Sequence, residues 1–285
     1  MKLCRYLNSY NELRLGLIHD DRTVADIGSG EHGRLTSLLE SENLTARLKE
    51  LSNQTLMAAP LANVRLLAPI ERQEVWAAGV TYLRSKTARM DESDFSAQAY
   101  NLVYEADRPE LFFKSLPEKV VASGEAVGIR KDAKWNVPEP ELALVINSKG
   151  KIVGYTIGND MSSRDIEGEN LLYLPQAKVY DRACALGPWI TVGASEVEAR
   201  AWSIKLNIVR DGKEVFSGDT SVSQMKRKLS ELANWLFRSQ TFPNGAVLLT
   251  GTGLVPGDDF TLQADDKIRI EISGIGVLEN HVAVV

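Results

Sequence analysis

Two glutamates stand two residues apart at the start of an apolar run. The sequence Pro138-Glu139-Pro140-Glu141 leads directly into residues 142–146, Leu-Ala-Leu-Val-Ile. A short apolar run of this kind is typical of a buried strand, and residues i and i+2 of a strand point to the same face. We therefore expect Glu139 and Glu141 to lie side by side where a strand enters the core. A solvated edge strand is the alternative, and the apolar continuation argues against it.

A third carboxylate follows on the next predicted strand. Residues 151–157 return beside the first strand after a turn at 147–150, which brings Asp160 back toward Glu139 and Glu141. Three close carboxylates repel one another unless a cation lies between them, and a hard ion such as Mg²⁺ or Mn²⁺ prefers oxygen ligands. The sequence thus predicts a divalent metal site. The alternative is that Asp160 only caps the short helix that follows, for which Ser162 is a candidate N-cap.

Two further residues could transfer protons. Lys178 follows the predicted metal hairpin, and a lysine beside a cation has a lowered pKa and can carry a proton. Glu110 precedes the predicted strand 111–114 and could act as a general base or simply pair with Arg108. Residues 250–253, Thr-Gly-Thr-Gly, could present backbone N–H groups and hydroxyls to an anion, or form a tight turn. A surface position is the alternative for Lys178.

Composition and charge exclude several classes of partner. The net charge is −5 and no basic run occurs, which argues against nucleic acid. No stretch approaches the roughly 20 apolar residues of a membrane span, and the first residues lack the apolar segment of a secretory signal. The two cysteines, Cys4 and Cys184, have no metal-binding or redox spacing. We therefore expect free thiols in a reducing, cytoplasmic setting.

The chain divides into two predicted parts. Residues 1–67 form a small N-terminal domain with short strands at 15–19 and 22–26 and short helices at 35–39 and 44–51. Residues 68–285 form a larger, strand-rich domain, with a hairpin turn at Asp211-Gly212 and a helix at 225–237. The polar, charged residues 84–100 suit a helical segment over the site. Helices do not alternate with strands, which argues against a Rossmann fold.

Taken together, these motifs resemble the fumarylacetoacetate hydrolase superfamily. They are Glu139-Pro140-Glu141, residues 154–165, Lys178, Gly187-Pro188 and the glycine pairs at 251–253 and 274–276. The resemblance runs from about residue 65 to the C-terminus and implies a strand-rich α+β fold, a mixed β-roll with a small N-terminal α/β domain. It implies that Mg²⁺, with Mn²⁺ or Ca²⁺ as alternatives, is bound by Glu139, Glu141 and Asp160. The catalytic residues would be Lys178 and Glu110, and the substrate-binding residues Arg164, Thr252 and Tyr82.

One departure separates the chain from the hydrolases of the superfamily. These usually carry a histidine three residues after a tyrosine. Here Ser85 stands at that position, three residues after Tyr82. Residues 108–114, 138–141 and 172–178 resemble the sugar-acid dehydratase branch more strongly.

The dehydratase resemblance implies Mg²⁺-dependent dehydration of a 2-keto-3-deoxy sugar acid, 2-dehydro-3-deoxy-D-arabinonate or xylonate, to 2,5-dioxopentanoate in pentose catabolism. A homo-oligomer is expected, and the order of Lys178 and Glu110 as base and acid is left open. An acylpyruvate-type C–C bond hydrolase and a non-catalytic metal-stabilised binding protein are the alternatives.

Overall fold

The computed structural model describes residues 1–28, 34–54, 58–83 and 102–285. The strands of these ranges are β1 (Lys2–Leu7), β2 (Leu13–His19), β3 (Thr23–Gly28), β4 (Ala58–Pro60), β5 (Arg65–Leu67), β6 (Glu74–Gly79), β7 (Glu110–Ser115), β8 (Val120–Val121), β9 (Ala126–Ile129), β10 (Asn136–Val137), β11 (Pro140–Ile146), β12 (Ile152–Asp160), β13 (Ser162–Ser163), β14 (Cys184–Thr191), β15 (Ser203–Arg210), β16 (Lys213–Ser221), β17 (Ala246–Leu249), β18 (Lys267–Ile272) and β19 (Gly276–Val284). The α-helices are α1 (Leu35–Leu39), α2 (Leu44–Gln54), α5 (Arg164–Glu169), α6 (Leu174–Lys178), α7 (Glu196–Arg200) and α8 (Leu229–Phe237).

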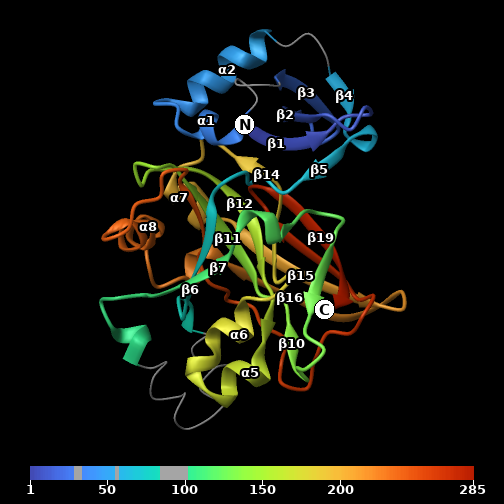
Figure 1. Cartoon of the computed structure of the whole chain (residues 1–285), viewed down its shortest axis with the longest axis vertical. Coiled ribbons are helices and arrows are strands. Elements are labelled where there is room, and N and C mark those ends of the chain that lie inside the picture. The colour runs from blue at the N-terminus through green and yellow to red at the C-terminus, as the bar shows by residue number, and fades with distance from the viewer. Residues whose placement is uncertain (29–33, 55–57, 84–101) are drawn as a thin grey trace.

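Two mixed sheets make up most of the molecule (Figure 1). Within the described ranges, a 12-stranded sheet has the order β4-β3-β2-β1-β14-β12-β11-β17-β6-β7, with β5 beside β1 and β8 beside β14. A 5-stranded sheet has the order β16-β15-β18-β19-β9. Most neighbours are antiparallel, while β17 with β6, β14 with β8 and β19 with β9 are parallel. The expected strand-rich α+β fold is confirmed.

The core lies where the two sheets face each other. The apolar side chains of β11 alternate between the two faces of its sheet, so that Leu142, Leu144 and Ile146 join the main core with residues of β15, β18 and α8. Ala143 faces the other way, toward Val247 and Leu249 of β17 and Val75 of β6. Strand β11 is therefore buried on both faces, which explains why its sequence is apolar throughout.

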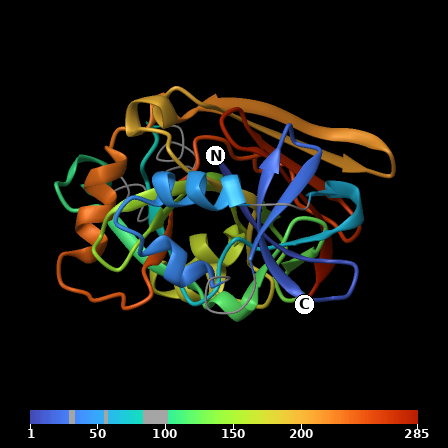
Figure 2. The same cartoon turned by 90° about the horizontal axis from the view of Figure 1, so that it is seen from above.

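The N-terminal strands and helices form one end of the molecule, and α5 and α6 lie at the opposite end (Figure 1). Helix α2 buries Leu44, Leu48 and Leu51, spaced at i, i+4 and i+7, against Leu15 and other apolar residues of β1 and β2. From above, these helices and strands lie over the rest of the molecule (Figure 2). Strand β1 also pairs with β14, so the N-terminal strands extend the main sheet. The domain boundary at residue 67 stays a prediction.

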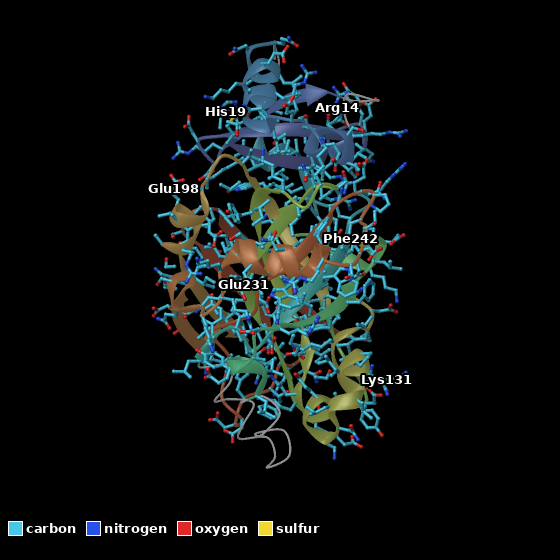
Figure 3. All side chains as sticks on the ribbon, turned by 90° about the vertical axis from the view of Figure 1, so that its left-hand side faces the viewer. Arg14, His19, Lys131, Glu198, Glu231 and Phe242 are labelled. Carbon is cyan, nitrogen blue, oxygen red and sulfur yellow. The ribbon has the colours of Figure 1, made fainter. Side chains whose placement is uncertain are left out.

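Helix α8 covers one side of the molecule (Figure 3). It carries Glu231 on the face turned to the viewer, and Phe242 lies beyond its end. The helix begins at Leu229 rather than at residue 225 as expected, because Met225 pairs with Tyr82 in an isolated β-bridge and residues 222–224 form a 3₁₀ turn. The helical segment expected at 84–100, and Ser85 within it, lie outside the described residues. No helix in the described part of the chain is long and apolar enough to cross a membrane.

Candidate active site

The β11–β12 hairpin brings three acidic residues together. Glu141 belongs to β11, Glu139 immediately precedes it, and Asp160 is the last residue of β12. The backbone N–H of Asp160 donates to the carbonyl of Glu139 at 3.0 Å, which fixes the register at this end. One carboxylate oxygen from each residue lies within 4.8 Å of the others, and each residue is at most 2 % exposed. The structure therefore assembles the acidic triad that the strand pattern predicts.

A donor from elsewhere in the fold holds one oxygen of each carboxylate. Arg164 Nη2 donates to Glu139 Oε1 at 2.8 Å, and the backbone N–H of Gly251 donates to Glu141 Oε2 at 2.6 Å. Lys114 Nζ forms an ion pair with Asp160 Oδ1 at 2.5 Å. Gly251 has φ +91°, and a Cβ there would collide with Thr81, so only glycine permits this approach of its N–H to Glu141.

Lys178 lies directly beside the triad at the end of α6. Its Nζ is 2.8 Å from Glu139 Oε2 and 3.4 Å from Asp160 Oδ2. It also donates to the hydroxyl of Ser162 at 2.5 Å, and Glu167 Oε2 is 4.0 Å away. The ammonium is fully buried, so the carboxylates around it offset its desolvation. The structure thus brings Lys178, one of the two residues expected to transfer protons, into direct contact with the acidic triad.

Ser162 does not cap the following helix, as the sequence suggested. The N-cap of α5 is Ser163, and its side chain makes no capping bond. Ser162 instead belongs to β13, which pairs with β10, and its hydroxyl donates to the carbonyl of Asp160 at 3.1 Å. The predicted N-cap was wrong because this serine takes part in the site's hydrogen-bond network.

Lys114 is a member of the site that sequence reasoning missed. It is 1 % exposed, and besides Asp160 its Nζ contacts the backbone carbonyls of Met161, at 2.9 Å, and of Lys178. The signal in the sequence was its position inside the predicted strand Leu-Phe-Phe-Lys, where alternation allows a side chain to point inward. Lysines are rarely buried unless paired, so this orientation could not be read from the chain alone.

The triad suits a hard divalent cation. Burial, followed by the negative charges of Asp160 and Glu139, raises the pKa of Glu141 well above its usual range. A cation between the three carboxylates would remove this repulsion. The triad also borders a cavity of about 10 Å³, which the backbones of Gly79 and Gly251 help to enclose, and this is roughly the space of one water-sized sphere. Oxygen donors, charge and size all fit Mg²⁺.

Glu110 lies on the neighbouring strand β7, opposite Gly79 of β6. A Cβ on Gly79 would collide with the Glu110 carboxylate, so the glycine allows the side chain to lie against the β6 backbone. Glu110 and Glu167 both line a cavity of about 380 Å³, together with Arg108 and apolar residues such as Leu171 and Leu174. The guanidinium of Arg108 is 4.7 Å from the ring centre of Trp235. This cavity has the room for a small substrate that the 10 Å³ cavity lacks.

The three residues expected to contact substrate lie in different surroundings from one another. Arg164 and Thr252 line the small cavity with the triad. The Thr252 hydroxyl donates to the carbonyl of Leu254 at 3.0 Å. Tyr82 is 1 % exposed, and its pKa is raised by burial and by the charge of Glu141. The phenol therefore stays a neutral hydroxyl at neutral pH.

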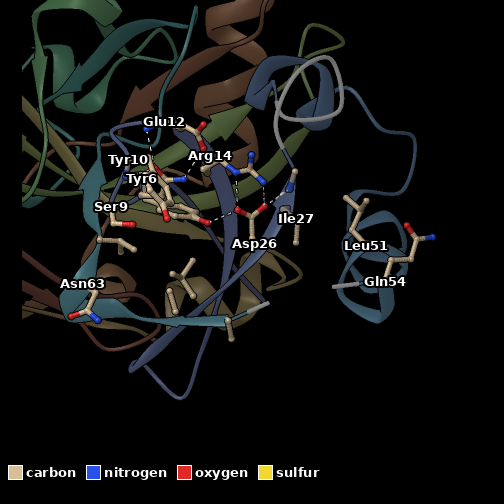
Figure 4. Close-up of a pocket in the computed structure, with 16 residues that line it drawn as sticks. Tyr6, Ser9, Tyr10, Glu12, Arg14, Asp26, Ile27, Leu51, Gln54 and Asn63 are labelled. Carbon is tan, nitrogen blue, oxygen red and sulfur yellow. Dashed lines mark hydrogen bonds and ion pairs between the residues drawn. The ribbon is translucent and has the colours of Figure 1, made fainter. Parts of the chain in front are cut away.

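A larger cavity, of about 700 Å³, lies in the N-terminal part of the chain (Figure 4). Two acidic residues line it, Glu12 and Asp26. The carboxylate of Asp26 accepts bonds from Arg14 at 2.7 and 2.9 Å, from the Tyr6 hydroxyl at 2.8 Å and from the N–H of Gly28 at 2.9 Å. The Asp26 carboxylate thus has its partners within the protein, whereas the triad gathers three carboxylates within 4.8 Å of one another. We therefore take the triad, rather than the larger cavity, as the candidate active site.

Comparison with known proteins agrees with the geometry. The family model described as "Fumarylacetoacetate (FAA) hydrolase C-terminal" matches residues 74–283. The chain belongs to the fumarylacetoacetate hydrolase family. It is 43% identical over 258 residues to the "Probable 2-keto-3-deoxyxylonate dehydratase" of Haloferax volcanii, covering 90% of this chain and 88% of that protein. It is 41% identical over 241 residues to the "2-dehydro-3-deoxy-D-arabinonate dehydratase" of Saccharolobus solfataricus, covering 83% and 81%.

A solved structure of the same fold also matches the whole chain. It is described as "2-keto-3-deoxy-D-arabinonate dehydratase complexed with magnesium and 2,5-dioxopentanoate". The TM-score is 0.80 at 34% identity, with 100% of this chain and 99% of that chain covered. The family and fold expected from the motifs are thereby confirmed.

Proposed function

We propose that this protein is a Mg²⁺-dependent hydro-lyase that converts a 2-keto-3-deoxy-pentonate to 2,5-dioxopentanoate and water. The observation that carries the proposal is the buried triad with Lys178 Nζ 2.8 Å from one of its carboxylates. Such a site combines a place for a divalent ion with a group that can move a proton. The relatives named as dehydratases and the magnesium-bound structure of the same fold support the same assignment.

Glu139, Glu141 and Asp160 are the residues that would hold the ion. Mg²⁺ bound there would supply a Lewis acid for the keto group of the substrate. The three carboxylates are kept in place by Arg164, Gly251 and Lys114. Because the protein fixes these groups before substrate arrives, little reorganisation is needed when charge develops during the reaction.

Lys178 and Glu110 are the proposed proton-transfer residues. In the first step one of them takes a proton from C3, and the other gives a proton to the C4 hydroxyl, which leaves as water and creates a C3–C4 double bond. A proton then leaves C5 and another returns to C3, which moves the double bond to C4–C5. The resulting enol takes a proton at C4 as its hydroxyl proton leaves, giving the C5 aldehyde. The net change is the loss of one water.

Arg164, Thr252 and Tyr82 are the proposed substrate contacts. Arg164 and Thr252 line the cavity beside the triad, so both lie within the region that the 2-keto acid head would reach. The Tyr82 phenol remains a neutral hydrogen-bond donor near Glu141, because its pKa is raised. A homo-oligomeric state, a cytoplasmic location and the division into residues 1–67 and 68–285 belong to the same proposal as expectations from the sequence.

The decisive experiment is incubation of the purified protein with 2-keto-3-deoxy-D-arabinonate or 2-keto-3-deoxy-D-xylonate and Mg²⁺. The product is followed with a coupled semialdehyde dehydrogenase. We expect formation of 2,5-dioxopentanoate, and no turnover of either acid in a folded, Mg²⁺-loaded protein would overturn the proposal. Pyruvate release from an acylpyruvate, in the same preparation, would instead support the hydrolase alternative.

A further inference from the structure

One step of the proposed reaction has no residue assigned to it. After the C4 hydroxyl has left, a proton must leave C5 while another returns to C3, so that the double bond moves from C3–C4 to C4–C5. A group that takes a proton must lie within hydrogen-bond reach of it. Because the keto-acid head of the substrate is held at the acidic triad, C5 is the end farthest from the triad. The group that serves C5 should therefore lie farther from the triad than the group that serves C3.

Two elements extend from the small cavity beside the triad to the cavity of about 380 Å³. On α5, Arg164 lines the small cavity and Glu167 the larger one, and residues three apart share a helix face. On β7, Phe112 lines the small cavity and Glu110 the larger one, and residues two apart share a strand face. The larger cavity thus continues from the triad between α5 and β7. A substrate held by its head at the triad would extend its C4–C5 end in this direction.

Glu167 lies where the triad's surroundings meet the larger cavity. Its side chain is 1 % exposed, and its Oε2 is 4.0 Å from Lys178 Nζ, which is itself 2.8 Å from Glu139 Oε2. The positive charge of Lys178 favours the ionised carboxylate, which is the form that accepts a proton. Among the described residues that line the larger cavity, Glu110 and Glu167 supply the carboxylates. Glu167 is therefore a carboxylate placed one step beyond Lys178 along the path of the substrate.

We propose that Glu167 is a third catalytic residue, which takes the proton from C5. After the first step, one member of the pair Lys178 and Glu110 holds the C3 proton, and the other has given its proton to the departing water. The first returns its proton to C3, where the electron pair of the C3–C4 double bond forms the new C–H bond. Glu167 takes the C5 proton, and the electron pair of that C–H bond becomes the C4–C5 double bond.

The last step restores all three groups. Glu167 gives its proton to C4 of the enol, and the hydroxyl proton of the enol passes to the residue that protonated the leaving hydroxyl. The aldehyde forms, and Lys178, Glu110 and Glu167 regain their starting forms, so that the only net change is the loss of one water. This inference rests on the proposed function and adds a residue to its mechanism.

The test is a single-turnover measurement on the full-length, Mg²⁺-loaded Glu167→Gln variant. Glutamine keeps the size of the side chain but cannot take the proton. Because Lys178 and Glu110 are intact, the variant should still form 5-hydroxy-2-oxopent-3-enoate, a conjugated enone that is followed by ultraviolet absorbance and NMR. We expect its conversion to 2,5-dioxopentanoate to slow by on the order of 10² to 10⁴, so that the enone accumulates while the rate of its formation changes little.

Two results in this variant would overturn the inference. A merely structural role of Glu167 would slow formation and conversion of the enone alike, and conversion at the wild-type rate would show that Glu167 is not needed. The wild type separates the inference from the proposed function. If it turns over neither acid, the proposed function fails and the inference with it, whereas an active Glu167→Gln that converts the enone normally removes the inference alone.

The matched control is Glu169→Gln. Glu169 is an exposed glutamate on the same helix, so the substitution removes the same charge from α5 outside the larger cavity. This variant should form 2,5-dioxopentanoate at the wild-type rate without accumulating the enone. Accumulation equal to that in Glu167→Gln would show that the loss of charge on α5 is sufficient, against the proposal.

Two further measurements keep the inference testable if Glu167→Gln does not fold. Glu167→Asp retains the carboxylate but withdraws it by one methylene, so the enone should accumulate less than the loss of the group would cause but more than in the wild type; no accumulation would contradict the proposal. In the wild type, a substrate with deuterium at one of its two C5 positions should give an aldehyde that either keeps or loses the label completely, because a fixed carboxylate removes the same hydrogen each time. A mixed product would show removal by water and overturn the inference.

Discussion

Replacing Glu141 by glutamine should separate metal binding from folding. One oxygen of each triad carboxylate lies within 4.8 Å of the others. At an effective dielectric constant of about 20, two charges at that distance repel by roughly 3.5 kcal/mol. At pH values where Glu141 is ionised, Glu141→Gln removes two such repulsions, and the glutamine oxygen can still accept the N–H of Gly251. The metal-free variant should therefore fold at least as stably as the wild type, while its affinity for Mg²⁺ falls.

The raised pKa of Glu141 determines how the stability of the protein and its affinity for Mg²⁺ change with pH. Because the folded-state pKa of Glu141 is raised, the folded protein keeps this proton at pH values where the unfolded chain has lost it. Its contribution to stability is fully present below its ordinary value of 4.5 and is lost as pH rises through the raised folded pKa. Each unit of the raised pKa corresponds to about 1.4 kcal/mol. Metal binding requires the ionised form, so Mg²⁺ affinity should rise by about tenfold per pH unit in that window.

The assay is thermal unfolding at several Mg²⁺ concentrations between pH 5 and pH 9. An ion at 100 times its dissociation constant stabilises the folded state by about 2.7 kcal/mol, which the wild type should show at high pH. Glu141→Gln should lose both this stabilisation and its pH dependence. Glu125→Gln, which alters a glutamate that accepts the Ala122 N–H outside the triad, serves as the control and should behave as the wild type. Wild-type Mg²⁺ affinity in Glu141→Gln would remove Glu141 from the ligand set.

The remaining predictions concern the proton-transfer pair and the backbone of the site. Lys178→Met and Glu110→Gln should each lower kcat by on the order of 10² to 10⁴ with little change in KM. Loss of the base should also stop deuterium exchange at C3, while loss of the acid should leave exchange measurable by NMR; near-normal kcat in both variants would refute the pair. Gly251→Ala should destabilise the protein by more than about 1 kcal/mol in chemical denaturation, because φ is +91° there and a Cβ would collide with Thr81. Unchanged stability of Gly251→Ala would show that the backbone relaxes freely at this position.

The triad could be predicted because it depends on local rules. Glu139 and Glu141 share a face through strand alternation, and Asp160 returns through the turn at residues 147–150. No distant contact is needed to bring the three together. The same holds for the hairpin of β2 and β3, whose turn residues Asp20 and Asp21 take positive φ.

The rest of the site depends on contacts that local patterns do not encode. The donors to the triad include Lys114 and Gly251, which approach from β7 and from the loop after β17. Strand alternation leaves open which face of β7 is buried, and the register of β17 against β11 is set by packing. The pairing of β1 with β14 joins residues about 190 positions apart, which no pattern in either segment predicts. Ser162 was wrongly predicted as the N-cap, because its hydroxyl accepts a hydrogen bond from the distant Lys178.

The most direct test of the account is the fate of 2-keto-3-deoxy-pentonate with the metal-free and Mg²⁺-loaded protein. The buried triad and the adjacent Lys178 predict no turnover after chelation and full recovery of 2,5-dioxopentanoate formation when Mg²⁺ is restored. A protein shown to be free of metal that still dehydrates the acid at the original rate would contradict the account.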